Sequence, residues 1–361
     1  MLHDDDLEAA VGAGVVTQAQ ADALRTFSRQ RQKVGVAERA DEERFRFMRG
    51  FNDFFFAIGV VLFGGGIAMY ASIRPSPIVY GLAAVSMWGL AELLVRRMRL
   101  VLPGIVIVLF FVIFVVLALS FVNLLTIPSP FLPSGTSGRS WSTPTFGHSG
   151  APQVAIKAVI AGLAAAGFYA RFRFPFALLL IAGSVVAAFE LAASHFLFED
   201  SAVANLLLLF LCGVAVFSVA MRFDLSDRLR ATRRSDCAFW LHVLAAPLLV
   251  HSLVDLVSDN TFKPDTFAAI MIVVIALLLT IVALIIDRRA LLVSALVYVG
   301  SAIAFALSNA AIDRSFILIA TLVILGALVL ALGVGWAPLR RRVVSVLPSN
   351  VVDRLPPVVP A

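Results

Sequence analysis

The stretch FFFAIGVVLFGGGIAMYASI, residues 54–73, decides the fold class of this chain. It contains 20 residues without a charged side chain. A helix of about 20 apolar residues, rising about 1.5 Å per residue, crosses the roughly 30 Å of hydrocarbon in a lipid bilayer. The stretch therefore predicts a membrane-spanning helix.

Nine further apolar runs follow the first one. Together they predict ten spans, at residues 54–73, 77–95, 101–123, 154–170, 174–198, 202–221, 237–257, 266–286, 290–310 and 315–336. The chain is 60% hydrophobic and 14% charged, whereas a soluble domain carries about 25% charged residues. We therefore expect an all-α, polytopic transmembrane helix bundle of about ten spans, with the lipid bilayer as its main partner.

Basic residues near the ends of the spans indicate the orientation. Eighteen arginines flank the ends that would face the cytoplasm, and five basic residues flank the opposite ends. The first set is Arg44, Arg46, Arg49, Arg96, Arg97, Arg99, Arg171, Arg173, Arg222, Arg228, Arg230, Arg233, Arg234, Arg288, Arg289, Arg340, Arg341 and Arg342, and the second is Arg74, Arg139, Lys157, Lys263 and Arg314. Basic residues collect on the cytoplasmic side of membrane proteins, so both termini are predicted in the cytoplasm, at the inner membrane of a bacterium. The net charge of +6 forms no continuous basic face, so nucleic acid is not an expected partner.

Three regions follow from this pattern. Residues 1–49 are predicted to form a cytoplasmic helical hairpin and a juxtamembrane helix, with Thr17 and Gln20 at the spacing of a capping box. This unit lacks the apolar segment of a signal peptide, and it is a candidate binding site for a cytoplasmic protein. Residues 50–340 form the transmembrane bundle. Residues 128–153 are predicted as an extracytoplasmic loop, and the proline-rich residues 341–361 as a disordered cytoplasmic tail.

Ionisable residues inside a membrane are costly, so they are candidate functional residues. Glu190 and His195 lie in the fifth span, followed by Glu199, and His251 and Asp255 lie four residues apart in the seventh span. Such groups would bind a metal, relay protons or contact a ligand; alternatively, those near the membrane surface are simply hydrated. We predict that Glu190 faces the bundle interior with His251 as its partner, because the two residues have similar depths. His242 is interpreted as a packed, hydrogen-bonded histidine.

Gly64, Gly65 and Gly66 form a second candidate feature, within the first span. A helix that breaks at these glycines would expose its backbone to a substrate. The alternative is an unbroken helix with a close-packing surface, helped by Ala68.

Three segments resemble an uncharacterised family of bacterial membrane proteins that have a short N-terminal helical hairpin and eight to ten spans. They are LEAAVGAGVVTQAQADAL at residues 7–24, SDCAFWLHVLAAPLLVH at residues 235–251 and DRRALLVSALVYVG at residues 287–300. The resemblance implies the same architecture, but it implies no activity, because the family has none established.

The sequence contains no enzyme motif such as a P-loop, G-x-S-x-G or H-E-x-x-H. No cofactor or metal is predicted, and an enzyme is not expected. Three hypotheses remain open: a small-solute carrier whose ligand the sequence does not specify, a membrane scaffold or sensor that acts through residues 1–49, and a membrane-embedded metal-dependent hydrolase.

Overall fold

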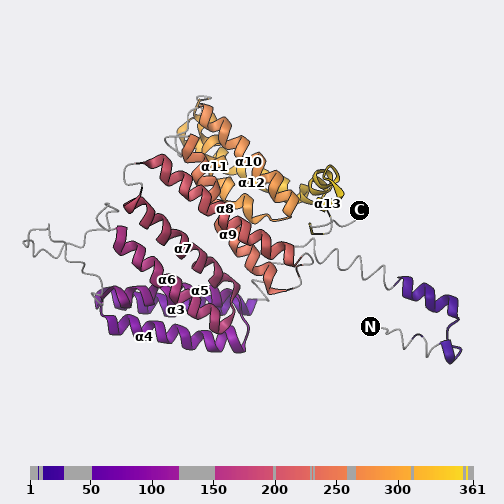
Figure 1. Ribbon diagram of the computed structural model, residues 1–361, viewed down its shortest axis with the longest axis horizontal. Coiled ribbons are helices and arrows are strands. Elements are labelled where there is room, and N and C mark those ends of the chain that lie inside the picture. Colours follow the sequence, from indigo (N-terminus) through magenta and orange to yellow (C-terminus); the bar gives the residue numbers. More distant parts are fainter. Residues whose placement is uncertain are drawn as a thin grey trace, which may run out of the picture.

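The computed structural model describes residues 7, 11–27, 51–121, 151–197, 201–227, 230, 232–257, 266–309, 313–352 and 355–356 (Figure 1). The helices of the membrane region are α3 (Phe51–Ile73), α4 (Pro77–Leu90) with its π-helical continuation η1 (Ala91–Arg97), α5 (Leu102–Phe121), α6 (Ala151–Phe172), α7 (Pro175–Phe196), α8 (Ala202–Ser226), α9 (Arg233–Val257), α10 (Thr266–Ile286), α11 (Ala290–Asn309) and α12 (Arg314–Ser345). No strand occurs among the described residues.

Nine of the described helices, counting α4 with η1 as one, are long and apolar enough to cross a membrane. The tenth is α11, with 20 residues, whose described apolar stretch is Ala295–Asn309. Each predicted span coincides with one of these ten helices. The prediction of an all-α, polytopic helix bundle is confirmed.

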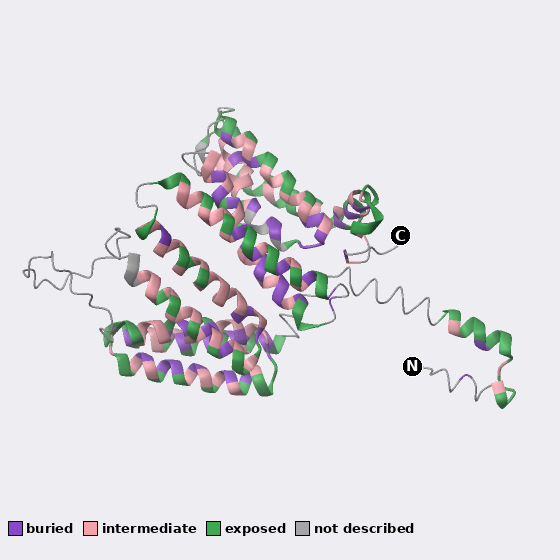
Figure 2. Cartoon of the chain, in the orientation of Figure 1, coloured by how far each residue is buried: buried purple, intermediate pink, exposed green. Residues whose placement is uncertain are grey.

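The outward faces of these helices are apolar. Large side chains such as Leu62 of α3, Leu211 of α8 and Leu330 of α12 are exposed, and exposed residues occur along the helices of both bundles (Figure 2). Extended apolar surface of this kind is unfavourable in water, whereas a bilayer solvates it. The chain is therefore a multi-pass integral membrane protein.

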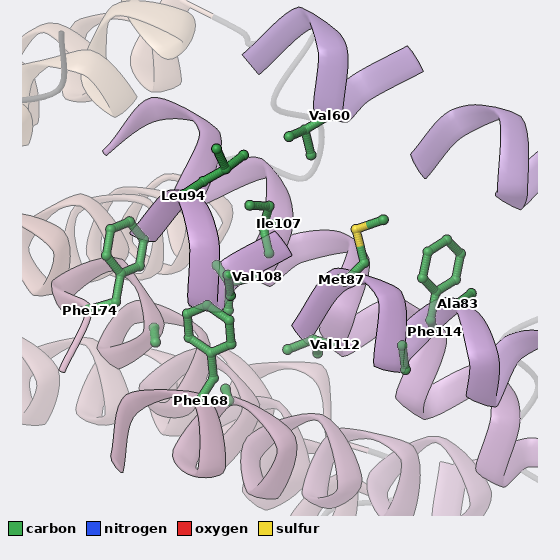
Figure 3. Packing of buried hydrophobic residues seen from close by; sticks show 14 of the residues in the cluster. Val60, Ala83, Met87, Leu94, Ile107, Val108, Val112, Phe114, Phe168 and Phe174 are labelled. Atoms are coloured by element: carbon green, nitrogen blue, oxygen red, sulfur yellow. The ribbon is translucent and has the colours of Figure 1, made fainter. Parts of the chain in front are cut away.

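Helices α3 to α7 form a first bundle. Its core contains aromatic and branched side chains from several helices, including Met87 of α4, Phe114 of α5 and Phe168 of α6 (Figure 3). The Trp88 ring lies against Phe168 and Phe172, with centroid distances of 6.1 and 5.2 Å. These contacts join α4 to α6 across the bundle.

Helices α8 to α12 form a second bundle, in which α9 has a central position. It packs against α8, α10 and α11, and it also contacts α7 of the first bundle. The second bundle has its own buried clusters, such as Leu284, Leu291 and Trp336 from three different helices. Helix α7 supplies the main contacts between the bundles, through α8 and α9, and it lies between the two groups of helices in Figure 1.

Several short connections at one end of the molecule contain a residue with a left-handed backbone. Arg99, Arg173, Arg230 and Asp287 have φ values of 57°, 49°, 51° and 57°. This conformation commonly ends a helix and is usually taken by glycine. We call this the basic end, because it carries most of the arginine clusters. The other end of the bundle is called the opposite end.

The regions that flank the bundle are described in part. The capping box is present in the N-terminal unit: the Thr17 N–H donates to Gln20 Oε1 at 2.9 Å, and the Gln20 N–H donates to Thr17 Oγ1 at 3.3 Å. Leu7 and Ala21 are buried there. The predicted juxtamembrane helix and most of the predicted loop at residues 128–153 lie outside the described residues.

The described part of the C-terminal tail differs from the predicted disorder. Helix α12 continues to Ser345, α13 (Ser349–Val352) follows, and Leu355 is buried. Arg340 donates from Nη2 to the Pro356 carbonyl at 2.8 Å. Over residues 341–352 and 355–356, the tail is thus partly helical and is joined to α12 by this hydrogen bond.

Candidate functional site

Glu190 lies in α7, six residues before the end of that helix at Phe196, or about 9 Å from it along the helix axis. Its Oε2 atom is buried and has no hydrogen-bond partner, and the same is true of Nδ1 of His195. Burying a carboxylate oxygen without a hydrogen-bond partner costs desolvation free energy, and helix packing alone does not require an acidic residue at this position. Glu190 is therefore the strongest candidate functional residue of the sequence-based set.

Glu190 lies close to the contact between the two bundles, which we call the seam. Helix α7, which carries Glu190, packs against α8 and α9 of the second bundle. Gly183 of α7 lies seven residues before Glu190, about two helical turns towards the basic end. It approaches Leu244 of α9 so closely that an added Cβ would lie 3.7 Å from Leu244 Cδ1. Helix α7 thus carries Glu190 about two turns beyond a close contact with the second bundle.

The seam is packed at the basic end. The rings of Phe176 (α7) and Trp240 (α9) meet edge to face with their centroids 4.6 Å apart. The buried Cys237 thiol of α9 lies three residues before Trp240. Aromatic side chains therefore close the seam at the basic end.

His251 and Asp255 lie near the opposite end of α9. His251 Nδ1 is 3.5 Å from Asp255 Oδ2, and the His251 side chain is 48% exposed. No hydrogen bond or ion pair joins His251 to Glu190 among the described residues, although α7 and α9 are neighbours. The predicted pairing of Glu190 with His251 stays a prediction.

Gly64, Gly65 and Gly66 lie within α3, which continues unbroken from Phe51 to Ile73. Gly64 is buried, and a Cβ atom at its position would lie 2.7 Å from the Phe110 ring of α5. The helix therefore has no break at these three glycines. Gly64 instead provides the space in which Phe110 packs.

A buried charge network at the basic end of the second bundle was not predicted. Its first part surrounds Asp224 of α8. His242 Nε2 lies 2.8 Å from Asp224 Oδ2, and Arg288 donates to the same carboxylate from Nε at 3.2 Å and from Nη2. Arg288 Nη2 also donates to Ser235 Oγ at 3.0 Å. Three segments, α8, α9 and the turn between α10 and α11, thus meet around one carboxylate.

The protonation of His242 follows from this geometry. Its ring is fully buried, and Nδ1 has no hydrogen-bond partner. A charged imidazole would need an acceptor at both nitrogens. The arrangement therefore fits a neutral His242 that donates from Nε2 to an ionised Asp224, and the prediction of a packed, hydrogen-bonded histidine is confirmed.

The second part of the network surrounds Asp287, in the turn between α10 and α11. Arg230 donates from Nη1 to Asp287 Oδ2 at 2.9 Å, and the Trp336 indole donates to Asp287 Oδ1 at 2.8 Å. Arg340 Nε lies 3.5 Å from Asp287 Oδ1. Two further hydrogen bonds from Arg230 reach the carbonyls of Ile286 and Asp287. The turn is thereby fixed to α12 and to the connection between α8 and α9.

Sequence reasoning missed this network because it treated the arginines only as orientation signals. The available signal was the presence of acidic residues beside those arginines, at Asp224, Asp227 and Asp287. Sequence separations of 57 and 64 residues between partners cannot be read from periodicity. Two of the segments that carry the family resemblance, residues 235–251 and 287–300, contain Ser235, His242, Asp287 and Arg288.

No family model, curated protein or solved structure matches this chain. Within the described ranges, no group of three or more His, Cys, Asp or Glu side chains is arranged to hold a metal ion. Glu199, which the hydrolase hypothesis also used, lies outside those ranges. The function must therefore be argued from Glu190, the seam and the charge network.

Proposed function

We propose that this multi-pass membrane protein is a carrier for a small polar solute or a cation. It would lie in the cytoplasmic membrane of a bacterium, with both termini and the basic end in the cytoplasm. The observation that carries the proposal is the buried, unpartnered oxygen of Glu190 beside the seam between two bundles. A carboxylate in that position would bind a proton, a cation or a hydrogen-bond donor of the solute.

The architecture supports this proposal. Alternating access in many transporters is a rocking of one helix bundle against another around a fixed binding site. Here each bundle has a core of its own, and a smaller apolar cluster joins α7 to α8 and α9 across the seam. The network around Asp224 and Asp287 fixes the ends of five helices together, so the second bundle would move as one body.

The proposed carrier is closed towards the cytoplasm in the described arrangement, because Phe176, Trp240 and Cys237 pack at the basic end of the seam. Transport requires this contact to open. Cys237 is a natural reporter of that opening, because it is buried and the only other cysteine is Cys212.

The test uses the Cys212→Ala variant, in which Cys237 is the single thiol. A membrane-impermeant maleimide applied from the cytoplasmic side of oriented vesicles should label Cys237 at a measurable rate. Glu190→Gln, which mimics the protonated carboxyl group, should change that rate several-fold by shifting the populations of the two states. The control is a cysteine at Ile107, which is fully buried in the first bundle.

A labelling rate at Cys237 that equals the rate at position 107, and that Glu190→Gln leaves unchanged, would contradict the carrier. That result would favour the scaffold or sensor. One observation supports this second candidate: Val15 and Phe27 of the N-terminal unit are 75% and 61% exposed. Apolar side chains exposed on a cytoplasmic helical unit would suit a protein partner, and capture of that partner should be lost when both are changed to Ser.

A further inference from the structure

A pocket of about 630 Å³ lies at the basic end of α4 and η1. Gly89, Glu92, Leu93, Arg96 and Arg97 line it. No described residue of α7, α8 or α9 lines this pocket, so it is separate from Glu190. Its chemistry is therefore independent of the proposed carrier function.

The polar part of the pocket has an excess of positive charge, to which Arg171, bound to the lining residue Glu92, also contributes. Arg96 donates from Nη1 to Glu92 Oε2 at 3.1 Å, and Arg171 of α6 donates from Nε to Glu92 Oε1 at 2.8 Å. The single carboxylate thus orients two guanidinium groups, which keep their other N–H groups for a ligand. No hydrogen bond or ion pair of Arg97 with another described residue occurs. Three arginines against one glutamate leave two positive charges without compensation.

The other part of the pocket is apolar and open. Leu93 is exposed, one turn before Arg97. At Gly89 an added Cβ would meet nothing within 4 Å, so the helix backbone itself forms part of the lining. The face therefore changes from apolar at Gly89 and Leu93 to cationic at Arg96 and Arg97, at the end of a membrane-spanning helix.

We propose that this pocket binds an anionic phospholipid from the leaflet at the basic end. Arginine N–H groups bind phosphate oxygens with charge-assisted hydrogen bonds, and basic pockets beside spans are suited to anionic headgroups. The phosphate lies at Arg96, Arg97 and Arg171, and an acyl chain covers Leu93 and the open space beside Gly89, which we call the Gly89 notch. A free phosphate ion would use the arginines but leave the apolar part empty.

The test measures lipid retained by the purified full-length protein, by native mass spectrometry after equal exposure to phosphatidylglycerol and phosphatidylcholine. The wild type should retain phosphatidylglycerol preferentially. Arg97→Gln should reduce that preference about fivefold, which is the effect of one basic residue at an anionic surface. Arg97→Lys keeps the charge and should lose less.

Gly89→Leu fills the Gly89 notch and should reduce the retention of phosphatidylglycerol. The substitution should leave the helix packing intact, because an added Cβ meets no other atom within 4 Å. The matched controls are Arg342→Gln, an exposed arginine at the basic end of α12, and Gly59→Leu, an open helical glycine in α3. Both should behave like the wild type. Circular dichroism of every variant verifies that the helices are intact.

Two outcomes would overturn the proposal. One is an unchanged phosphatidylglycerol preference in both Arg97→Gln and Gly89→Leu. The other is loss of binding in Arg97→Gln but not in Gly89→Leu, together with displacement of the lipid by millimolar inorganic phosphate. The second result would assign the arginines to a free anion rather than to a lipid.

Discussion

Several charged residues of this protein are buried in protein although they lie just beyond the ends of the apolar runs. Asp224, Asp287, Arg288 and Arg340 are all buried, and each carboxylate has cationic or N–H partners from other elements. Buried ion pairs add little net stability, because desolvation offsets their attraction. Their importance lies in what happens when one partner is removed.

The first prediction concerns the pair formed by Asp224 and Arg288. Asp224→Leu leaves the Arg288 guanidinium buried without its carboxylate, so we expect a loss of about 3–5 kcal/mol in stability. The double variant Asp224→Leu with Arg288→Leu removes both charges and should lose less than Asp224→Leu alone. Denaturation in detergent, followed by tryptophan fluorescence, measures both. Arg342→Leu, at an exposed position, should change stability by no more than about 0.5 kcal/mol.

A double variant that is destabilised by the full sum of its two single variants would contradict this coupling. Additivity of that kind is the behaviour of independent sites. It would mean that Arg288 and Asp224 do not share one interaction in the membrane.

The predictability of the site differs from residue to residue. Glu190 could be chosen from sequence because a single acid inside an apolar run is conspicuous. Asp224 could not, because it follows Arg222 near the end of an apolar run and is readily interpreted as a hydrated residue. Burial of such a residue depends on which distant turn covers it, and here that turn comes from residues 286–289.

At the scale of helices, α3 shows how one glycine sets the distance between two spans. The space at Gly64 holds the Phe110 ring of α5, whereas Gly65 and Gly66 would meet nothing within 4 Å if a Cβ were added. Three consecutive glycines therefore have different roles, which their sequence alone does not distinguish.

The second prediction follows from this difference. Gly64→Ala should destabilise the protein by about 1–3 kcal/mol, because the new methyl group overlaps a buried ring. Gly65→Ala and Gly66→Ala should be neutral or stabilising by up to about 1 kcal/mol, since alanine is the better helix former. Thermal unfolding of the three variants in the same detergent measures the contrast. If all three behave alike, Phe110 does not pack on Gly64.

The helices themselves were largely predictable, and their ends were less so. Apolar length located all ten, because hydrocarbon thickness sets the minimum run. The observed α8 and α12 end at Ser226 and Ser345, beyond the predicted ends at residues 221 and 336. An apolar run ends where the hydrocarbon ends, but helical hydrogen bonding continues through the polar residues that follow.

For the whole molecule, the ten helices alternate in direction, so the orientation of one fixes the others. The third prediction is that reporter fusions after Arg99, Arg173, Arg234 and Arg289 read as cytoplasmic, whereas a fusion near Gly138 reads as extracytoplasmic. The reason is the excess of basic residues at one set of span ends. Two adjacent fusions with reversed signals would be incompatible with ten spans.

The charge network also has a consequence for how the chain is made. Asp224 is synthesised 64 residues before its partner Arg288, and Asp287 is synthesised 49 residues before Trp336. At a synthesis rate of about 5–20 residues per second, Arg288 is added roughly 3–13 s after Asp224. A nascent chain that ends before residue 288 would carry the Asp224 carboxylate without its arginine, whereas a chain that lacks only α12 would keep this pair and lose the Trp336 and Arg340 contacts of Asp287.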